Sequence, residues 1–224
     1  VYMDKRFLMI LAAIVVVFGG LIALNKSNQA STTDSKPTNH VAGKLDSKVT
    51  FVEYGDFQCN ACKSYSEVFG EVKKKYEGTV KFQFRHMPLS QIHPNAFAAA
   101  RAAEAAGKQN KFWEMHDLLY SQQDPTAQSG WVASQSVLTD YFVNFAKQVG
   151  LDVEKFKKDY ASSEVNNSIN ADIKEFEKTG QQKATPAFFI NGKSVSLDKL
   201  IDKNNNASAD AFSKVIDDEL AKVN

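Results

Sequence analysis

The alternation of apolar and polar residues along the chain predicts strands and helices in a mixed order. Lys48 to Tyr54 alternates and is rich in Val, Phe and Tyr, which predicts a half-buried strand. From Asn60 to Tyr76, apolar residues recur every three or four positions, which predicts a helix with one buried face. Thr79 to Met87 alternates again and predicts a second strand. Because a strand, a helix and a strand in succession form a crossover, we expect these two strands to pair in parallel.

The second half of the chain predicts a helical section, a hairpin and a final helix. The helical segments are Pro94 to Ala106, Asn110 to Tyr120, Val137 to Val149, Val153 to Tyr160 and Ser163 to Lys178. An apolar run with Pro186 at its start then predicts a strand, and the Asn-Gly pair after it predicts a hairpin turn. Asp210 to Val223 carries apolar residues on one helical face. We therefore expect an α/β domain over residues 47–224, with helices inserted at about residues 94–179.

An uninterrupted apolar run, Phe7 to Leu24, precedes this domain. At about 1.5 Å a residue it reaches about 27 Å, close to the roughly 30 Å hydrocarbon core of a bilayer. A cleaved signal peptide is the alternative, but its apolar region is usually about 7 to 15 residues long and ends near a small-residue cleavage site. Lys5 and Arg6 lie before the run and Lys26 after it, so the positive-inside rule places the N-terminus in the cytoplasm. We expect residues 1–26 to form an uncleaved transmembrane signal anchor.

Composition and charge restrict the partners of the remaining chain. Residues 27–46 are mostly Ser, Thr, Asn, Gln, Lys and Pro, and we expect them to form a flexible tether. The 224 residues carry a formal net charge of +1, which gives no argument for a nucleic-acid partner. The predicted orientation of the anchor puts the domain outside the cytoplasm, where disulfides form and persist. We therefore expect a single-pass cell-membrane protein with an extracytoplasmic domain.

Cys59 and Cys62 are the only cysteines in the chain, and two residues separate them. Within a first helical turn this spacing brings two Cα atoms to the roughly 4.4 to 6.8 Å that a disulfide requires, which favours a redox dithiol. A structural staple is an alternative, although so short a loop would remove only about 2 kcal/mol of unfolded-state entropy. Half of a zinc site is another, but the chain has no second pair of this spacing and its four histidines are scattered. We assign His93 and His116 to packing or solvent, because a lone helical histidine seldom has a special role.

The predicted elements place Cys59 where a thiol becomes reactive. It lies at the start of the helix predicted from Asn60, whose unpaired amides and dipole favour an anion and so lower the pKa of a thiol. It also follows the end of a predicted strand, where open α/β sheets place their sites. We therefore expect an exposed Cys59 with a lowered pKa and a covered Cys62.

From Val49 to Val223 the chain resembles the DsbA-type branch of the thioredoxin superfamily, specifically its membrane-anchored bacterial members. Four segments carry the resemblance: Phe51 to Lys63 with the cysteine pair, Phe84 to Leu89, His93 to Tyr120, and Ala184 to Lys193. The resemblance implies a thioredoxin-like α/β fold with an inserted helical subdomain.

The same resemblance implies roles for five residues. Cys59 is the nucleophile and Cys62 the buried resolving thiol. Glu53 is the buried acid that moves protons to or from Cys62, since burial raises the pKa of a carboxyl group; an exposed strand position is its alternative. Pro186 is expected to follow a cis peptide bond and face the dithiol. Thr185 then offers its backbone to the cysteine of a bound substrate.

These observations together predict a thiol-disulfide oxidoreductase that introduces disulfides into exported, cysteine-containing proteins. The resemblance implies a DsbB-like or VKOR-like membrane partner for re-oxidation, and no cofactor or metal beyond the Cys59–Cys62 disulfide. The family's best-known oxidases carry Pro-His between the cysteines, whereas this chain has Asn60-Ala61. A disulfide isomerase or reductase therefore stays an alternative, as does a tethered chaperone or binding module with the cysteines as a staple.

Overall fold

A computed structural model describes residues 35–124 and 126–223 of the chain. The expected membrane anchor, Phe7 to Leu24, lies outside these residues. Within the two described ranges, no helix has both the length and the apolar character that crossing a bilayer requires.

The described residues form a five-stranded sheet with the order β1-β3-β2-β4-β5. Its strands are β1 (His40–Gly43), β2 (Thr50–Gly55), β3 (Lys81–His86), β4 (Ala187–Ile190) and β5 (Lys193–Val195). The pair β2 and β3 is parallel, as the sequence predicts, and the other neighbouring pairs are antiparallel. The expected hairpin turn at Asn191-Gly192 joins β4 to β5.

Helices cover both faces of this sheet. One face packs against α2 (Asn60–Lys75) and α9 (Ala209–Leu220), where an apolar cluster is built around Phe51, Phe69 and Phe212. The opposite face packs against α8 (Ser163–Glu177), whose Phe176 contacts Tyr54 in an edge-to-face arrangement with ring centroids 5.0 Å apart. The apolar periodicity found along these helices therefore marks the faces that they bury.

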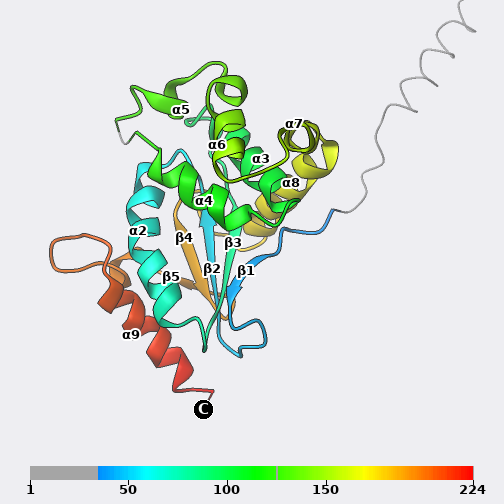
Figure 1. Cartoon of the computed structure of the whole chain (residues 1–224). Coiled ribbons are helices and arrows are strands. Elements are labelled where there is room, and N and C mark those ends of the chain that lie inside the picture. Colours follow the sequence, from blue (N-terminus) through cyan, green and yellow to red (C-terminus); the bar gives the residue numbers. More distant parts are fainter. Residues whose placement is uncertain (1–34, 125, 224) are drawn as a thin grey trace, which may run out of the picture. The chain divides into compact units, whose positions relative to one another are not determined.

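The inserted helices lie between β3 and β4 in the chain, and Figure 1 shows them gathered toward the end of the sheet at which β2 ends. They are α3 (Ala96–Gly107), α4 (Phe112–Ser121), α5 (Gly130–Ala133), α6 (Val143–Gln148), α7 (Val153–Tyr160) and α8. Their apolar core also includes Phe57 and Cys62, so the inserted helices complete the surroundings of the cysteine pair. The predicted helical insertion is confirmed.

Two details differ from the sequence-based expectation. Residues 27–46 are not a flexible tether throughout, because β1 pairs with β3 and Thr38 is buried, with its amide and hydroxyl donating to Asp172. The polar composition of this segment hid an edge strand that only tertiary pairing stabilises. The predicted single helix from Val137 to Val149 is instead a π-helical turn, Leu138–Phe142, followed by α6.

Candidate active site

The site forms where β2 ends and α2 begins. Strand β2 ends at Gly55, where a Cβ atom would come 2.5 Å from the Phe84 ring, so a larger residue would force the packing apart. The chain then turns through Asp56, Phe57 and Gln58, which are all buried, and reaches Cys59 as the N-cap residue of α2. The prediction that Cys59 lies at a helix N-terminus is confirmed.

The two cysteines are free thiols that lie 3.7 Å apart. Cys59 is half-buried rather than fully exposed, whereas Cys62 is completely buried. This separation is short enough for a disulfide to form after a small adjustment of the side chains. The two thiols are therefore placed to form a disulfide with each other.

The surroundings push the pKa values of the two thiols in opposite directions. A hydrogen bond with Cys62, more than any other cause, lowers the pKa of Cys59 from 9.0 to about 6, although partial burial opposes it. Burial, followed by the hydrogen bond to Cys59, raises the pKa of Cys62 well above its ordinary value. The predicted direction for Cys59 is confirmed, but its main cause is the hydrogen bond with Cys62 and not the helix dipole.

The loop before β4 brings Thr185 and Pro186 against Cys59. The Cys59 thiol donates a hydrogen bond to the Thr185 carbonyl oxygen over 3.4 Å, across a sequence separation of 126 residues. The Thr185–Pro186 peptide bond is cis, which confirms that expectation. Thr185 is partly exposed and Pro186 is buried, so Thr185 lies at the surface beside the half-buried sulfur.

Glu53 lies on β2, before the turn that leads to Cys59, and is buried, with 1% of its surface exposed. This excludes the alternative of an exposed strand position. Among the described residues, no hydrogen bond is made to its Oε1 atom. Burial raises the pKa of Glu53 from 4.5 to about 7, while the charge of Lys73 partly lowers it. The Glu53 charge in turn raises the pKa of Cys62, which places the carboxyl group within electrostatic reach of that thiol.

Asp56 and His93 also belong to this site, although the sequence alone did not predict either of them there. His93 is not simply packed or solvated, because its Nδ1 atom lies 2.7 Å from the Asp56 carboxylate and its ring lines the same cleft as Cys59. No local spacing relates Asp56 to His93, which is 37 positions away, so periodicity could not join them. His116 is buried among aromatic rings, which agrees with the packing role expected for it.

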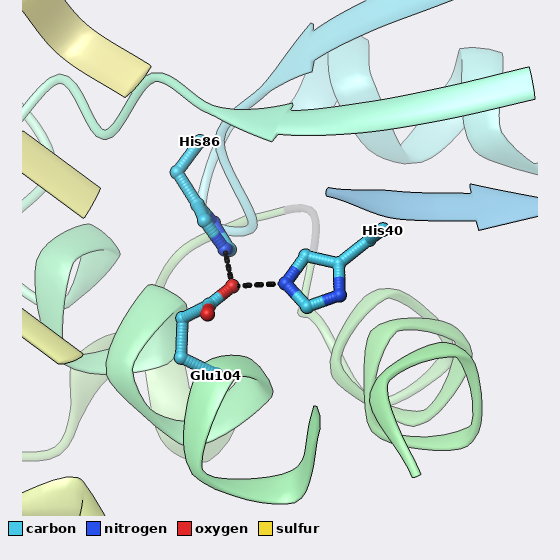
Figure 2. A group of neighbouring side chains, drawn as sticks. All are labelled: His40, His86 and Glu104. Atoms are coloured by element: carbon cyan, nitrogen blue, oxygen red, sulfur yellow. Dashed lines mark hydrogen bonds and ion pairs between the residues drawn. The ribbon is translucent and has the colours of Figure 1, made fainter. Parts of the chain in front are cut away.

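Within the part of the chain that the structure describes, one cluster has the chemistry of a metal site, and it includes neither cysteine. Figure 2 shows His40, His86 and Glu104 pointing toward one another from β1, the end of β3 and α3. The Nε2 atoms of both histidines contact the same Glu104 oxygen, with His86 at 2.7 Å. Burial acts to raise the pKa of Glu104, but hydrogen bonds from both histidines outweigh burial and lower this pKa to about 2. We interpret these hydrogen bonds as a link between β1 and the inserted helices, although the buried Nδ1 atom of His86 has no hydrogen-bond partner among the described residues.

Comparison with known proteins identifies the family of this site. A sequence model described as thioredoxin matches residues 35–218. The chain belongs to the thioredoxin family. Within that superfamily it is a DsbA-like protein, as the resemblance of its sequence implied.

Two solved structures illustrate the likeness. Oxidised BdbD from Bacillus subtilis is 28% identical, with a TM-score of 0.66, and the match covers 84% of this chain and 97% of that protein. A thioredoxin-like oxidoreductase from Silicibacter pomeroyi DSS-3 has a TM-score of 0.64 over 82% of this chain and 93% of its own. The identity of that second protein is 23%, so it supports the fold alone.

Curated relatives include the Na(+)/H(+) antiporter NhaA 1 from Mycolicibacterium gilvum, which is 36% identical over 157 residues. The match covers 69% of this chain and 24% of the antiporter. A similar match, 34% identical over 155 residues, is found in the Na(+)/H(+) antiporter NhaA 3 from Salinispora tropica and covers 22% of that protein. The chain therefore spans about a quarter of the length of these relatives.

Proposed function

We propose that this protein is a thiol-disulfide oxidoreductase that donates the Cys59–Cys62 disulfide to cysteine-containing proteins. The observation that carries the proposal is the pair itself, with two thiols 3.7 Å apart whose pKa values are shifted in opposite directions. A thiol of low pKa is a good leaving group and a good nucleophile near neutral pH, whereas its buried partner is held in reserve. A structural staple would need neither property.

The reaction proceeds through a mixed disulfide on Cys59. A substrate thiolate attacks the Cys59 sulfur of the oxidised pair, so that a substrate–Cys59 bond forms, the Cys59–Cys62 bond breaks, and Cys62 takes up a proton. A second substrate thiolate attacks the substrate sulfur of the mixed disulfide and releases Cys59 as a thiolate. The substrate thereby loses two electrons and gains a disulfide, and the protein pair becomes the dithiol.

Two neighbouring groups support these steps. The Thr185 backbone, whose carbonyl accepts a hydrogen bond from Cys59, pairs with the extended backbone of the substrate beside the reacting sulfur. Pro186 positions this loop. The buried Glu53 carboxyl group, with a pKa of about 7, gives a proton to the leaving Cys62 sulfur and takes it back when Cys62 attacks.

The expected setting of this activity is the outer side of a bacterial cell membrane. It rests on the sequence alone, where Phe7 to Leu24 has the length of a transmembrane anchor and basic residues precede it. The resemblance to the DsbA-type branch suggests exported proteins as substrates. It also suggests a DsbB-like or VKOR-like membrane protein that removes the two electrons from the Cys59–Cys62 dithiol. The antiporter relatives do not change this proposal, because the match covers only about a quarter of their length and the site is built for thiol exchange.

Equilibration of the full chain with reduced and oxidised glutathione tests this function. An oxidase should remain largely dithiol in a buffer that oxidises thioredoxin-like reductants, because its thiolate is stabilised. A reductase or isomerase, the alternative that Asn60-Ala61 keeps open, would hold its disulfide in more reducing mixtures. Failure of the pair to exchange with glutathione at all would reject the enzyme and leave a binding module with a stapled loop.

A further inference from the structure

A cleft of about 850 Å³ opens beside Cys59, between the start of α2 and the segments before α3 and after α5. Its described lining residues include polar amides and hydroxyls, such as Gln58, Asn60 and Ser134. Apart from Cys59, His93 is the one described lining residue that can carry a charge. Any charge that faces Cys59 from across this cleft therefore belongs to His93.

The imidazole is held in place by a buried carboxylate. His93 Nδ1 donates to Asp56 Oδ2 over 2.7 Å, and the Asp56 side chain is completely inaccessible to solvent. Asp56 also accepts from the amides of Gln58, at 2.7 Å, and Leu89, at 2.8 Å. The carboxylate is thus fixed by three N–H donors, and its bond to Nδ1 leaves the opposite side of the imidazole ring free to face away from Asp56.

The charge of Asp56 also acts on Cys59. The negative charge of Asp56 lies close enough to raise the pKa of the Cys59 thiol, which disfavours the thiolate. The two residues between the cysteines, Asn60 and Ala61, carry no compensating charge. The nearby lysines are directed elsewhere: Lys63 donates to the Tyr120 carbonyl oxygen at 2.8 Å, and Lys183 forms an ion pair with Glu177.

We propose that His93 in its protonated form stabilises the Cys59 thiolate from across the cleft, and that Asp56 is the positioning residue that holds it there. This inference rests on the proposed function, because it concerns the same thiolate. It gives a role in thiolate stabilisation to an Asp–His pair that lies outside the segment from Cys59 to Cys62.

The direction of the His93 pKa shift agrees with the geometry. The hydrogen bond to Asp56 raises the pKa of His93 against the opposing effect of burial, and the charges of Asp56 and Cys59 raise it further. His93 is therefore protonated over a wider pH range than a free histidine, and this range overlaps that in which Cys59 ionises at a pKa of about 6. As the pH rises through the pKa of His93, the support for the thiolate is lost.

The substitution His93→Asn separates charge from geometry, because an Asn side-chain amide can replace the Nδ1–H bond to Asp56 without a positive charge. We expect the pKa of Cys59, followed in the reduced full chain by the ultraviolet absorbance of the thiolate, to rise by about one unit. The equilibrium with glutathione should move about tenfold toward the protein disulfide, since one pKa unit is a factor of about ten. An unchanged Cys59 pKa would overturn the proposal.

Two further variants complete the experiment. His93→Arg keeps a positive charge, so the Cys59 pKa should stay nearer the wild-type value than in His93→Asn; a pKa as high as in the Asn variant would reject charge stabilisation. His40→Asn removes an equally sheltered histidine that is bonded to Glu104 and does not line the cleft, and it should leave the Cys59 pKa unchanged. Thermal unfolding of each variant shows whether it is folded. Exchange that persists in His93→Asn with no pKa change would leave the proposed function standing and remove this inference alone.

Discussion

The cleft beside Cys59 and the interior around Cys62 are one helical turn apart, yet they shift the pKa of a thiol in opposite directions. On the cleft side, the sulfur is half-buried and its pKa is lowered to about 6. On the interior side, the sulfur is fully buried and its pKa is raised, with Glu53 as its ionisable neighbour. The comparison shows that the two-residue spacing does not itself make a redox pair. The hydrogen bond with Cys62 lowers the pKa of Cys59, and full burial raises the pKa of Cys62, so each cysteine has its own role.

The largest effect on disulfide exchange is expected when each cysteine sulfur is removed in turn. Cys59→Ser should abolish disulfide exchange, because no nucleophile remains on the cleft side. Cys62→Ser should instead accumulate a mixed disulfide with a substrate or with glutathione, because the resolving thiol is gone. Mass spectrometry of the trapped adducts distinguishes the two. Adducts on Cys62 in the Cys59→Ser protein would show that the two environments are interchangeable.

The reactivity of the reduced protein toward iodoacetamide gives the next largest effect. With a pKa of about 6, Cys59 is mostly thiolate at pH 7, whereas Cys62, with its raised pKa, is mostly protonated. Because Cys62 is also fully buried, we expect Cys59 to be alkylated at least about tenfold faster. The rate plotted against pH should have its midpoint near 6 for Cys59. Equal rates at the two thiols would contradict the comparison.

The sequence predicts the parts of this site that depend on neighbouring residues and misses those that depend on contacts between distant segments. Alternating and three-to-four-residue patterns locate β2, α2 and β3, because burial on one face is written into neighbouring positions. They therefore also locate Cys59 at the start of α2. The contact of Cys59 with Thr185 depended on a family resemblance, since 126 residues separate the two. The burial of Glu53 likewise had no local signature.

The elements that were missed share one physical reason, which is that other segments stabilise them. Strand β1 is four residues long and polar in context, and its pairing with β3 is what makes it a strand. The Asp56–His93 pair joins a loop after β2 to the segment before α3, so neither residue is distinctive in its own neighbourhood. A sequence signal that could have suggested it is the placement of Asp56 three residues before Cys59, in a turn that must bury its carboxylate.

Replacing Glu53 tests the interior environment through the pH dependence of the free energy of unfolding. Folding raises the pKa of Glu53 from 4.5 to about 7, so the folded state binds this proton more tightly than the unfolded state. The free energy of unfolding therefore falls as the pH rises from 4.5 to about 7, by roughly 3 kcal/mol, and stays lower above that range. Glu53→Gln should remove this loss and be more stable than the wild type at alkaline pH.

Denaturant unfolding of the reduced proteins across this pH range measures the effect as a difference between variant and wild type. The matched control is Glu71→Gln, at an exposed position of α2, which should show no such pH-dependent gain. A Glu53→Gln protein that tracks the wild type at every pH would mean that Glu53 titrates as an ordinary surface acid.

The smallest expected effect concerns Lys73 on α2, whose charge acts on Glu53. Its charge lowers the pKa of Glu53, in opposition to burial, and its Nζ atom lies 4.1 Å from the centre of the Trp113 ring. Lys73→Met keeps an apolar chain against that ring and removes the charge, so the pKa of Glu53 should rise by less than about one unit. NMR titration of the Glu53 carboxyl carbon measures this shift directly. Lys74→Met, at the exposed neighbouring position, is the control and should leave the titration unchanged. A Glu53 pKa that stays the same or falls in Lys73→Met would show that burial alone sets the interior environment, and the charge on α2 would then have no part in the difference between the two thiols.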